Sequence, residues 1–132
     1  MSDLALSLLS ESLIGKRVKS ATKSNLTLDD GTVIELFESA QDCCAAAYGD
    51  WALADAVDLD AAITAVELTS EEQEDYDSHY TSGELRIMHN QNPIALGDLY
   101  AGSGNGGYYY SVLSVKVHLP NGGSVQTELI SS

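Results

Sequence analysis

The sequence predicts an α+β fold, with a mostly antiparallel sheet of about five to seven strands and one or two short helices. One stretch near the start has apolar residues at helical spacing, and several later stretches alternate as strands do. Turn sequences at residues 29–32 and 120–123 favour hairpins between neighbouring strands. No internal repeat or linker is evident in the sequence, so we expect residues 1–132 to form a single domain.

Residues 3–13 are expected to form a short amphipathic helix that ends at Gly15. Four leucines in this stretch recur at helical spacing, with Ser and Glu between them. We expect this helix, within residues 1–14, to pack on a sheet-based core formed by residues 15–132 or on a partner subunit.

A β-hairpin is predicted to follow the helix. Residues 17–22 and 25–28 contain alternating and β-branched side chains, and they lead into an Asp-Asp-Gly-Thr turn at 29–32. Residues 33–37 then return as the partner strand.

The middle of the chain is rich in alanine and then in acidic residues. Residues 41–62 predict one short helix and a compact irregular segment. Residues 63–68 are a candidate strand. The acidic run at 71–77 lies between apolar segments, which is typical of a solvated loop or a helix turn, and it is a weak candidate for a site.

The second half predicts further strands. Residues 83–90 alternate, with Leu85 and Ile87 on the face opposite Arg86, whereas residues 96–100 are ambiguous. A glycine-rich loop at 102–107 precedes three tyrosines and a long strand, which turns into a last strand at 124–130. The long strand is expected to place Leu113, Val115, Val117 and Leu119 on one face and Val112, Ser114, Lys116 and His118 on the other.

The chain is strongly acidic. Twenty Asp and Glu residues against six Lys and Arg residues give a formal charge of -14, which disfavours direct binding to nucleic acid. The same charge favours solubility, attraction to a basic protein, or mimicry of DNA. The 44% hydrophobic content is that of a chain that folds.

The sequence lacks the features of a secreted, membrane-spanning or metal-binding protein. The start lacks the positive segment of a secretory signal, and no apolar run has membrane-spanning length, so a cytoplasmic protein with no membrane partner is expected. Cys43 and Cys44 are adjacent, which disfavours a disulfide between them, and the three histidines are scattered. We expect no metal, no cofactor and no enzymatic activity, because no catalytic constellation is recognisable.

Two groups of residues are candidates for ligand binding. Asn105, Tyr108 and Tyr109 lie in or after the glycine loop, where backbone N–H groups can hold an anion and aromatic rings can stack on a base. A mobile hairpin loop and an aromatic subunit interface are the alternatives for this segment. Arg86 and Lys116 are cations within predicted strands and are candidates for holding an anion, with a surface ion pair as the alternative.

Four motifs occur in order along the chain: Leu13-Ile14-Gly15-Lys16, Asp30-Gly31-Thr32, Gln41-Asp42-Cys43-Cys44 followed by Tyr48, and Asn105-Gly106-Gly107-Tyr108-Tyr109. Their order resembles a family of small phage and prophage proteins of unknown function, over most of residues 13–118. The chain departs from this pattern at Ala45, where an acidic residue is expected, and at Gly107, which is an extra glycine.

The resemblance implies a function directed against the host. The family is similar to the Thoeris anti-defence sponges, which sequester cyclic nucleotide-derived immune signals between subunits. The similarity implies a homo-oligomer in the host cytoplasm that binds a cyclic ADP-ribose type signal or a cyclic oligonucleotide. The implied pocket residues are Arg86, Asn90, Asn105, Tyr108, Tyr109 and Lys116.

Three functions therefore compete. The resemblance favours a protein that sequesters a nucleotide-derived signal. The charge of -14 favours an acidic inhibitor of a basic host protein, including one that mimics DNA. A nucleotide hydrolase is the third, and no motif in the sequence supports it.

Overall fold

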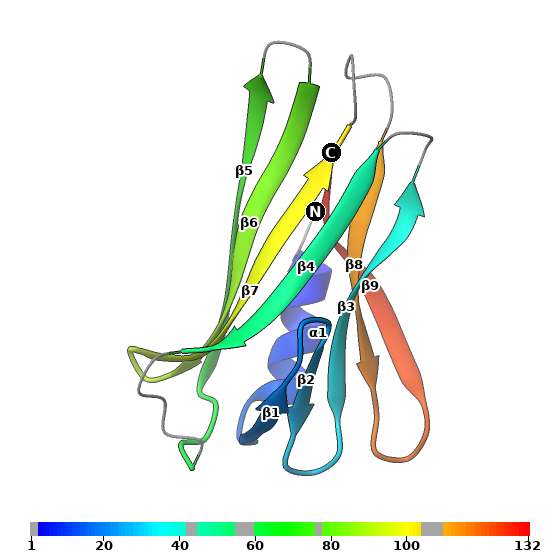
Figure 1. The fold of residues 1–132 in the computed structure, drawn as a ribbon. Helices are drawn as coiled ribbons and strands as arrows, with labels where there is room; N and C mark the ends of the chain where they lie inside the picture. The colour runs from blue at the N-terminus through cyan, green and yellow to red at the C-terminus, as the bar shows by residue number, and fades with distance from the viewer. Residues whose placement is uncertain (1–2, 42–44, 55–59, 76–77, 104–109) are drawn as a thin grey trace.

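The computed structural model describes residues 3–41, 45–54, 60–75, 78–103 and 110–132 (Figure 1). The expected α+β class is confirmed, although the strands in these ranges outnumber the expected five to seven. The elements are α1 (Asp3–Leu13), β1 (Val18–Ala21), β2 (Asn25–Leu28), β3 (Val33–Gln41), β4 (Ala46–Leu53), β5 (Ala65–Asp75), β6 (Ser78–His89), β7 (Asn92–Gly102), β8 (Ser111–His118) and β9 (Ser124–Ser131).

The strands form two antiparallel sheets. One has the order β1-β2-β3-β8-β9 and the other the order β4-β7-β6-β5. Most neighbours are consecutive hairpins, as expected, whereas the β3–β8 and β4–β7 pairs join strands that are distant in the sequence. Helix α1 is confirmed at its expected position (Figure 1). It contacts β5, β8 and β9.

A single apolar core fills the space between the sheets and α1. Alternate residues of β3, β6 and β8 point into it, and the buried face of α1 covers it. Burying one Leu or Ile side chain fully contributes about 1.5–3 kcal/mol, so this core is the main stabilising term. Fully buried side chains include Leu9, Leu13, Ile34, Leu85, Ile87, Leu113 and Val115.

Strand β4 corrects the expectation of a helix and an irregular segment at residues 41–62. Its residues alternate between exposed and buried, and Ala47, Gly49 and Trp51 point inward. A Cβ atom at Gly49 would lie 3.0 Å from Leu36 Cδ1, so small residues are needed where β4 passes the other sheet. At Ala47 and Gly49 the small residues therefore serve close packing between strands. Cys43 and Cys44 lie outside the described residues.

The acidic run also differs from the expected loop or helix turn. Residues 71–75 continue β5 to its end, and they pair with the first residues of β6. The backbone hydrogen bonds of an antiparallel ladder stabilise an extended chain here in spite of the low strand propensity of Glu and Asp. The ambiguous stretch at 96–100 is likewise part of a strand, β7.

The long strand β8 has the predicted faces, with one exception. Leu113, Val115 and Val117 are buried, as expected. Ser114 is also buried, although it belongs to the opposite face, and its hydroxyl lies 2.7 Å from the hydroxyl of Ser39. In the part of the chain that the structure describes, no helix is long and apolar enough to cross a membrane.

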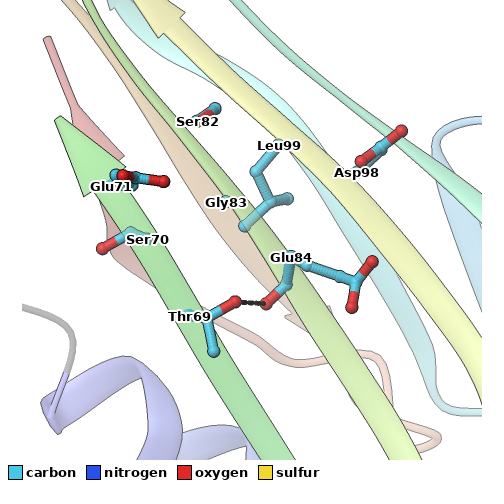
Figure 2. Close-up of a pocket in the computed structure, with 8 residues that line it drawn as sticks. All are labelled: Thr69, Ser70, Glu71, Ser82, Gly83, Glu84, Asp98 and Leu99. Carbon is cyan, nitrogen blue, oxygen red and sulfur yellow. Dashed lines mark hydrogen bonds between the residues drawn. The ribbon is translucent and has the colours of Figure 1, made fainter. Parts of the chain in front are cut away.

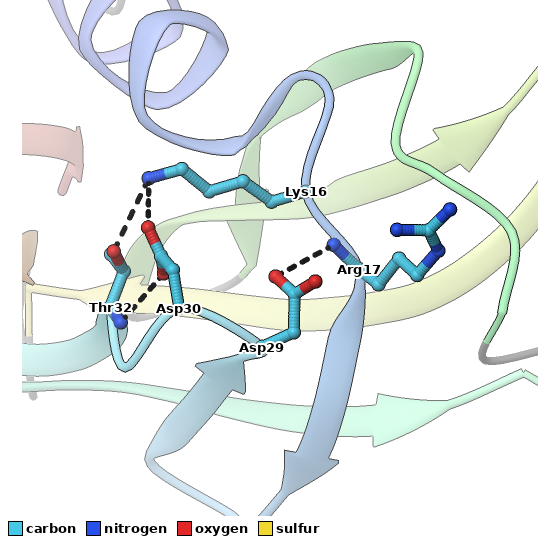
Figure 3. A network of polar contacts seen from close by, with 5 residues as sticks. All are labelled: Lys16, Arg17, Asp29, Asp30 and Thr32. Carbon is cyan, nitrogen blue, oxygen red and sulfur yellow. Dashed lines mark hydrogen bonds and ion pairs between the residues drawn. The ribbon is translucent and has the colours of Figure 1, made fainter.

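A polar network joins the end of α1 to the β2–β3 hairpin (Figure 3). Lys16 Nζ lies 2.8 Å from Asp30 Oδ2 and donates to the buried Thr32 hydroxyl at 3.3 Å. Thr32 N donates to Asp30 Oδ1 at 2.9 Å, and Arg17 N donates to Asp29 Oδ1 at 3.2 Å. Mainly because of the Lys16 hydrogen bond, the pKa of Asp30 is lowered to about 2.

We predict that this network makes the free energy of unfolding sensitive to acid. Because the pKa of Asp30 is lowered from 3.8, its contribution is complete above about pH 4 and is lost as the pH falls toward about 2. The Lys16 and Asp30 side chains are 28% and 36% exposed, so solvent screens the pair and the contribution should stay below about 1 kcal/mol. Urea unfolding at several pH values should show the same reduced acid sensitivity in Asp30→Asn and Lys16→Gln. A wild-type acid response in both variants would contradict this assignment.

Candidate functional site

The outer face of the four-stranded sheet gathers aromatic and acidic side chains in rows. Alternate residues of each strand point away from the core, and the pairing register places them side by side. Tyr48 of β4 is opposite Tyr100 of β7, and two residues along, Asp50 is opposite Asp98. Asp98 is in turn opposite Glu84 of β6.

Three tyrosines form a continuous stack on this face. The ring centroids of Tyr48 and Tyr100 lie 4.8 Å apart, and those of Tyr80 and Tyr100 lie 5.6 Å apart, with interplanar angles of 22° and 27°. The Tyr80 hydroxyl donates to Gln73 Oε1 at 2.9 Å, which fixes one end of the stack. Tyr48, at the other end, is 56% exposed, so much of its ring faces solvent.

A row of carboxylates runs next to the tyrosines. Asp50, Asp98 and Glu84 occupy directly opposite positions on three strands, an arrangement in which like charges repel. Arg86 forms an ion pair with Glu84, with Nε and Oε1 2.5 Å apart. The hydrogen bond to Glu84 raises the pKa of the Arg86 guanidinium above its ordinary value. We call Tyr48, Tyr80, Tyr100, Asp50, Asp98 and Glu84 the tyrosine–carboxylate face.

Two pockets open on this face. One of about 220 Å³ lies between the tyrosines and the carboxylates and is lined by Tyr48, Asp50, Asp98, Leu99 and Tyr100. The second, of about 430 Å³, extends across β5, β6 and β7 (Figure 2). Its lining residues are Thr69, Ser70, Glu71, Ser82, Gly83, Glu84, Asp98 and Leu99.

Gly83 contributes only backbone to the larger pocket, because strand alternation directs its Cβ position to the core side of the sheet, like those of the opposite residues Ser70 and Leu99. A Cβ atom at this position would lie 2.5 Å from the backbone oxygen of Thr69, so no other residue fits without a shift of β5. Figure 2 shows the side chains of Glu71, Glu84 and Asp98 around the position of Gly83. The pocket is thus a depression with carboxylates at its rim.

The chemistry of the face suits a positively charged ligand. Carboxylates accept charge-assisted hydrogen bonds from ammonium and guanidinium groups, and the faces of tyrosine rings attract cations. Among the described residues, no group of three or more His, Cys, Asp or Glu side chains is arranged to hold a metal ion.

The structure distributes the sequence-predicted site residues over different regions. Arg86 lies on the outer side of β6 beside Glu84, whereas Lys116 lies in the other sheet, on β8, opposite Glu35. Asn90 lies in the turn after β6 with a φ of 55°, and its N–H donates to Thr64 Oγ1 at 2.6 Å. Asn105, Tyr108 and Tyr109 lie outside the described residues. Of the three expected residues that the structure describes, Arg86 alone borders the tyrosine–carboxylate face.

Sequence reasoning missed the tyrosine–carboxylate face itself. One signal was available: Tyr48-Gly49-Asp50 and Asp98-Leu99-Tyr100 are mirror images, as two antiparallel neighbours with matching rows require. This signal has meaning only once β4 and β7 are known to pair.

Comparisons with known proteins identify one family. A model for a domain of unknown function (DUF7448) matches residues 11–116. The matched segment includes β4 to β7, which carry the tyrosine–carboxylate face. Neither the curated proteins nor the solved structures include a significant match.

We predict that the carboxylate row lowers the free energy of unfolding. Because Asp98 lies between Asp50 and Glu84, Asp98→Asn should raise the free energy of unfolding by about 0.2–1 kcal/mol at low salt. High salt should remove most of this gain. Denaturant titration at two salt concentrations measures it, with Glu128→Gln on β9 as the charge-matched control. Equal effects of the two substitutions would mean that the row carries no local repulsion.

Proposed function

This chain belongs to the DUF7448 family, the domains of unknown function whose model spans most of it, and we propose that it is a binding protein whose tyrosine–carboxylate face holds a basic segment of another protein. The row formed by Asp50, Asp98 and Glu84 carries this proposal. Such a row is unfavourable in the free protein, and Lys or Arg side chains of a partner would relieve the repulsion.

The tyrosine stack supports the same function. Tyrosine is enriched in protein interfaces, because its ring buries a large area at a low cost in side-chain entropy. The exposed ring of Tyr48 lies beside Asp50 and Asp98 at the smaller pocket. A cation there would contact a carboxylate and an aromatic face together, which strengthens its binding relative to either group alone.

The extent of the charge favours a polypeptide over a single small cation. Exposed carboxylates continue from Asp50 on β4 to Glu67 and Glu71 on β5, at the opposite edge of the sheet. Among the residues that the register places on this outer face, Arg86 is the one Lys or Arg side chain. Several Lys or Arg side chains on one partner are needed to match charges spread over four strands.

The test compares two variants with equal net charge. Asp50→Asn/Asp98→Asn removes two carboxylates from the face, and Glu11→Gln/Glu128→Gln removes two exposed carboxylates elsewhere. Binding to a set of Lys-rich and Arg-rich peptides is measured by calorimetry at low and moderate salt. We expect the face variant to weaken binding about tenfold and the control to change it little.

Equal weakening by the two variants would show that net charge alone attracts the peptides, and the proposal would then be wrong. Tyr48→Ala provides a second readout, since loss of the exposed ring should weaken binding with no change in charge. Binding that is unaffected by salt would also contradict an electrostatic interface.

A second candidate function is the sequestration of a nucleotide-derived immune signal, which the resemblance to phage anti-defence proteins suggests. One observation favours it. Tyr80 and Tyr100 stack beside Gly102, at the end of β7 from which the chain continues toward Asn105, Tyr108 and Tyr109. Stacked aromatic rings bind nucleobases, although the nearby carboxylates repel phosphates.

If the second candidate holds, native mass spectrometry should detect an oligomer that retains an intact nucleotide. The panel contains cyclic ADP-ribose isomers and cyclic di- and trinucleotides. Tyr108→Ala/Tyr109→Ala should lose the retained molecule, and Tyr110→Ala serves as the control because this side chain is half exposed. Retention of none of these molecules, or undiminished retention by the double variant, would exclude this function.

A further inference from the structure

Strand β5 is an open edge next to the tyrosine–carboxylate face. It is the outermost strand of its sheet, and among the described residues it pairs with β6 alone. In a strand paired on one side, alternate backbone N–H and C=O groups point away from the sheet. An edge of eleven residues therefore offers a long row of donors and acceptors to another strand.

The other three edges are less suited to a basic partner. The free side of β4 is partly used, because Ala47 N donates to Glu38 Oε2 and Trp51 N donates to the backbone oxygen of Lys23. Strand β1 has four residues, of which Lys19 is a cation. Strand β9 has a single acidic residue, Glu128, so it provides little charge to attract Lys or Arg.

The sequence of β5 selects the kind of strand that can pair with it. It contains five acidic residues and no Lys or Arg. The exposed carboxylates include Glu67 and Glu71 on the outer face and Glu72 on the other. A second copy of β5 would be repelled by this charge, whereas a strand rich in Lys or Arg would be attracted.

The larger pocket lies directly behind this edge. It begins at Thr69, Ser70 and Glu71 of β5 and continues past Gly83 to Glu84 and Asp98 (Figure 2). Neighbouring strands lie about 4.8 Å apart, so a side chain of an added strand has to cross only β5 to enter it. The long, flexible side chains of Lys and Arg can make this crossing and place a cation among the carboxylates.

We infer that β5 accepts an extended basic segment of a partner protein, which adds to the sheet as a further strand and places a Lys or Arg side chain in the pocket beside Gly83. This inference rests on the proposed function and specifies its geometry. Backbone hydrogen bonds supply affinity in such strand addition, and the pocket supplies the preference for a cation.

The test measures amide hydrogen exchange in β5 with a synthetic probe. The probe is a peptide of about ten residues that alternates Lys and Thr, a length that matches one strand. Binding of the peptide should slow exchange at alternate amides of residues 65–75 by about tenfold or more. Two further peptides carry N-methyl groups on one or the other alternate set of residues, and strand addition predicts that one of them binds about tenfold more weakly than the other.

Glu71→Gln tests the pocket, with Glu128→Gln as the charge-matched control. We expect Glu71→Gln to weaken peptide binding several-fold more than the control. Binding that is sensitive to Asp50→Asn/Asp98→Asn, but leaves β5 exchange unchanged and the two methylated peptides equal, would overturn strand addition and leave the proposed function intact. Binding that no face substitution weakens more than its control would overturn the proposed function and this inference together.

Discussion

The close passage of β4 over β3 and β8 is the contact on which the rest of the structure depends. It joins the two sheets, and it is possible because Gly49 leaves room for Leu36 and Leu113, which lie 3.0 and 3.2 Å from the position of an added Cβ atom. Trp51 anchors the crossing, since its Nε1–H donates to the backbone oxygen of Ile34 at 3.1 Å. Once these two residues point inward, strand alternation directs Tyr48 and Asp50 outward. The packing that holds the sheets together therefore also creates the tyrosine–carboxylate face.

The six Lys and Arg residues of the chain are distributed unevenly, and their scarcity on the four-stranded sheet leaves the tyrosine–carboxylate face acidic. Lys16 pairs with Asp30, and Arg17 Nε donates to the backbone oxygen of Asp60, so both stabilise the segments around the end of α1. On the four-stranded sheet Arg86 pairs with Glu84, and the register leaves Asp50 and Asp98 facing one another. Ion pairs and hydrogen bonds thus offset charge around the end of α1. On the exposed face of the four-stranded sheet, carboxylates remain in excess.

An excess of carboxylates beside stacked tyrosines and an open edge strand is more consistent with binding to a basic polypeptide than with binding to an anion. The cations that would hold phosphates, Arg86 and Lys116, are in different sheets, and Arg86 already contacts Glu84. A nucleotide would have to draw its favourable contacts from the aromatic rings, against the field of nearby carboxylates. Both candidates use the stacked tyrosines of β6 and β7, which lie within the segment that the family model matches.

The sequence by itself determined the local elements and the charge. The leucines of α1, the Asp-Gly turn after β2 and the alternation in β8 are local signals, and the structure confirms all three elements. It did not determine β4 or the continuation of β5 through its acidic run, because the small residues of β4 and the carboxylates of β5 have low strand propensity. The tyrosine–carboxylate face was decided by tertiary structure, since Asp50 and Asp98 become neighbours only when strands distant in sequence pair in one register.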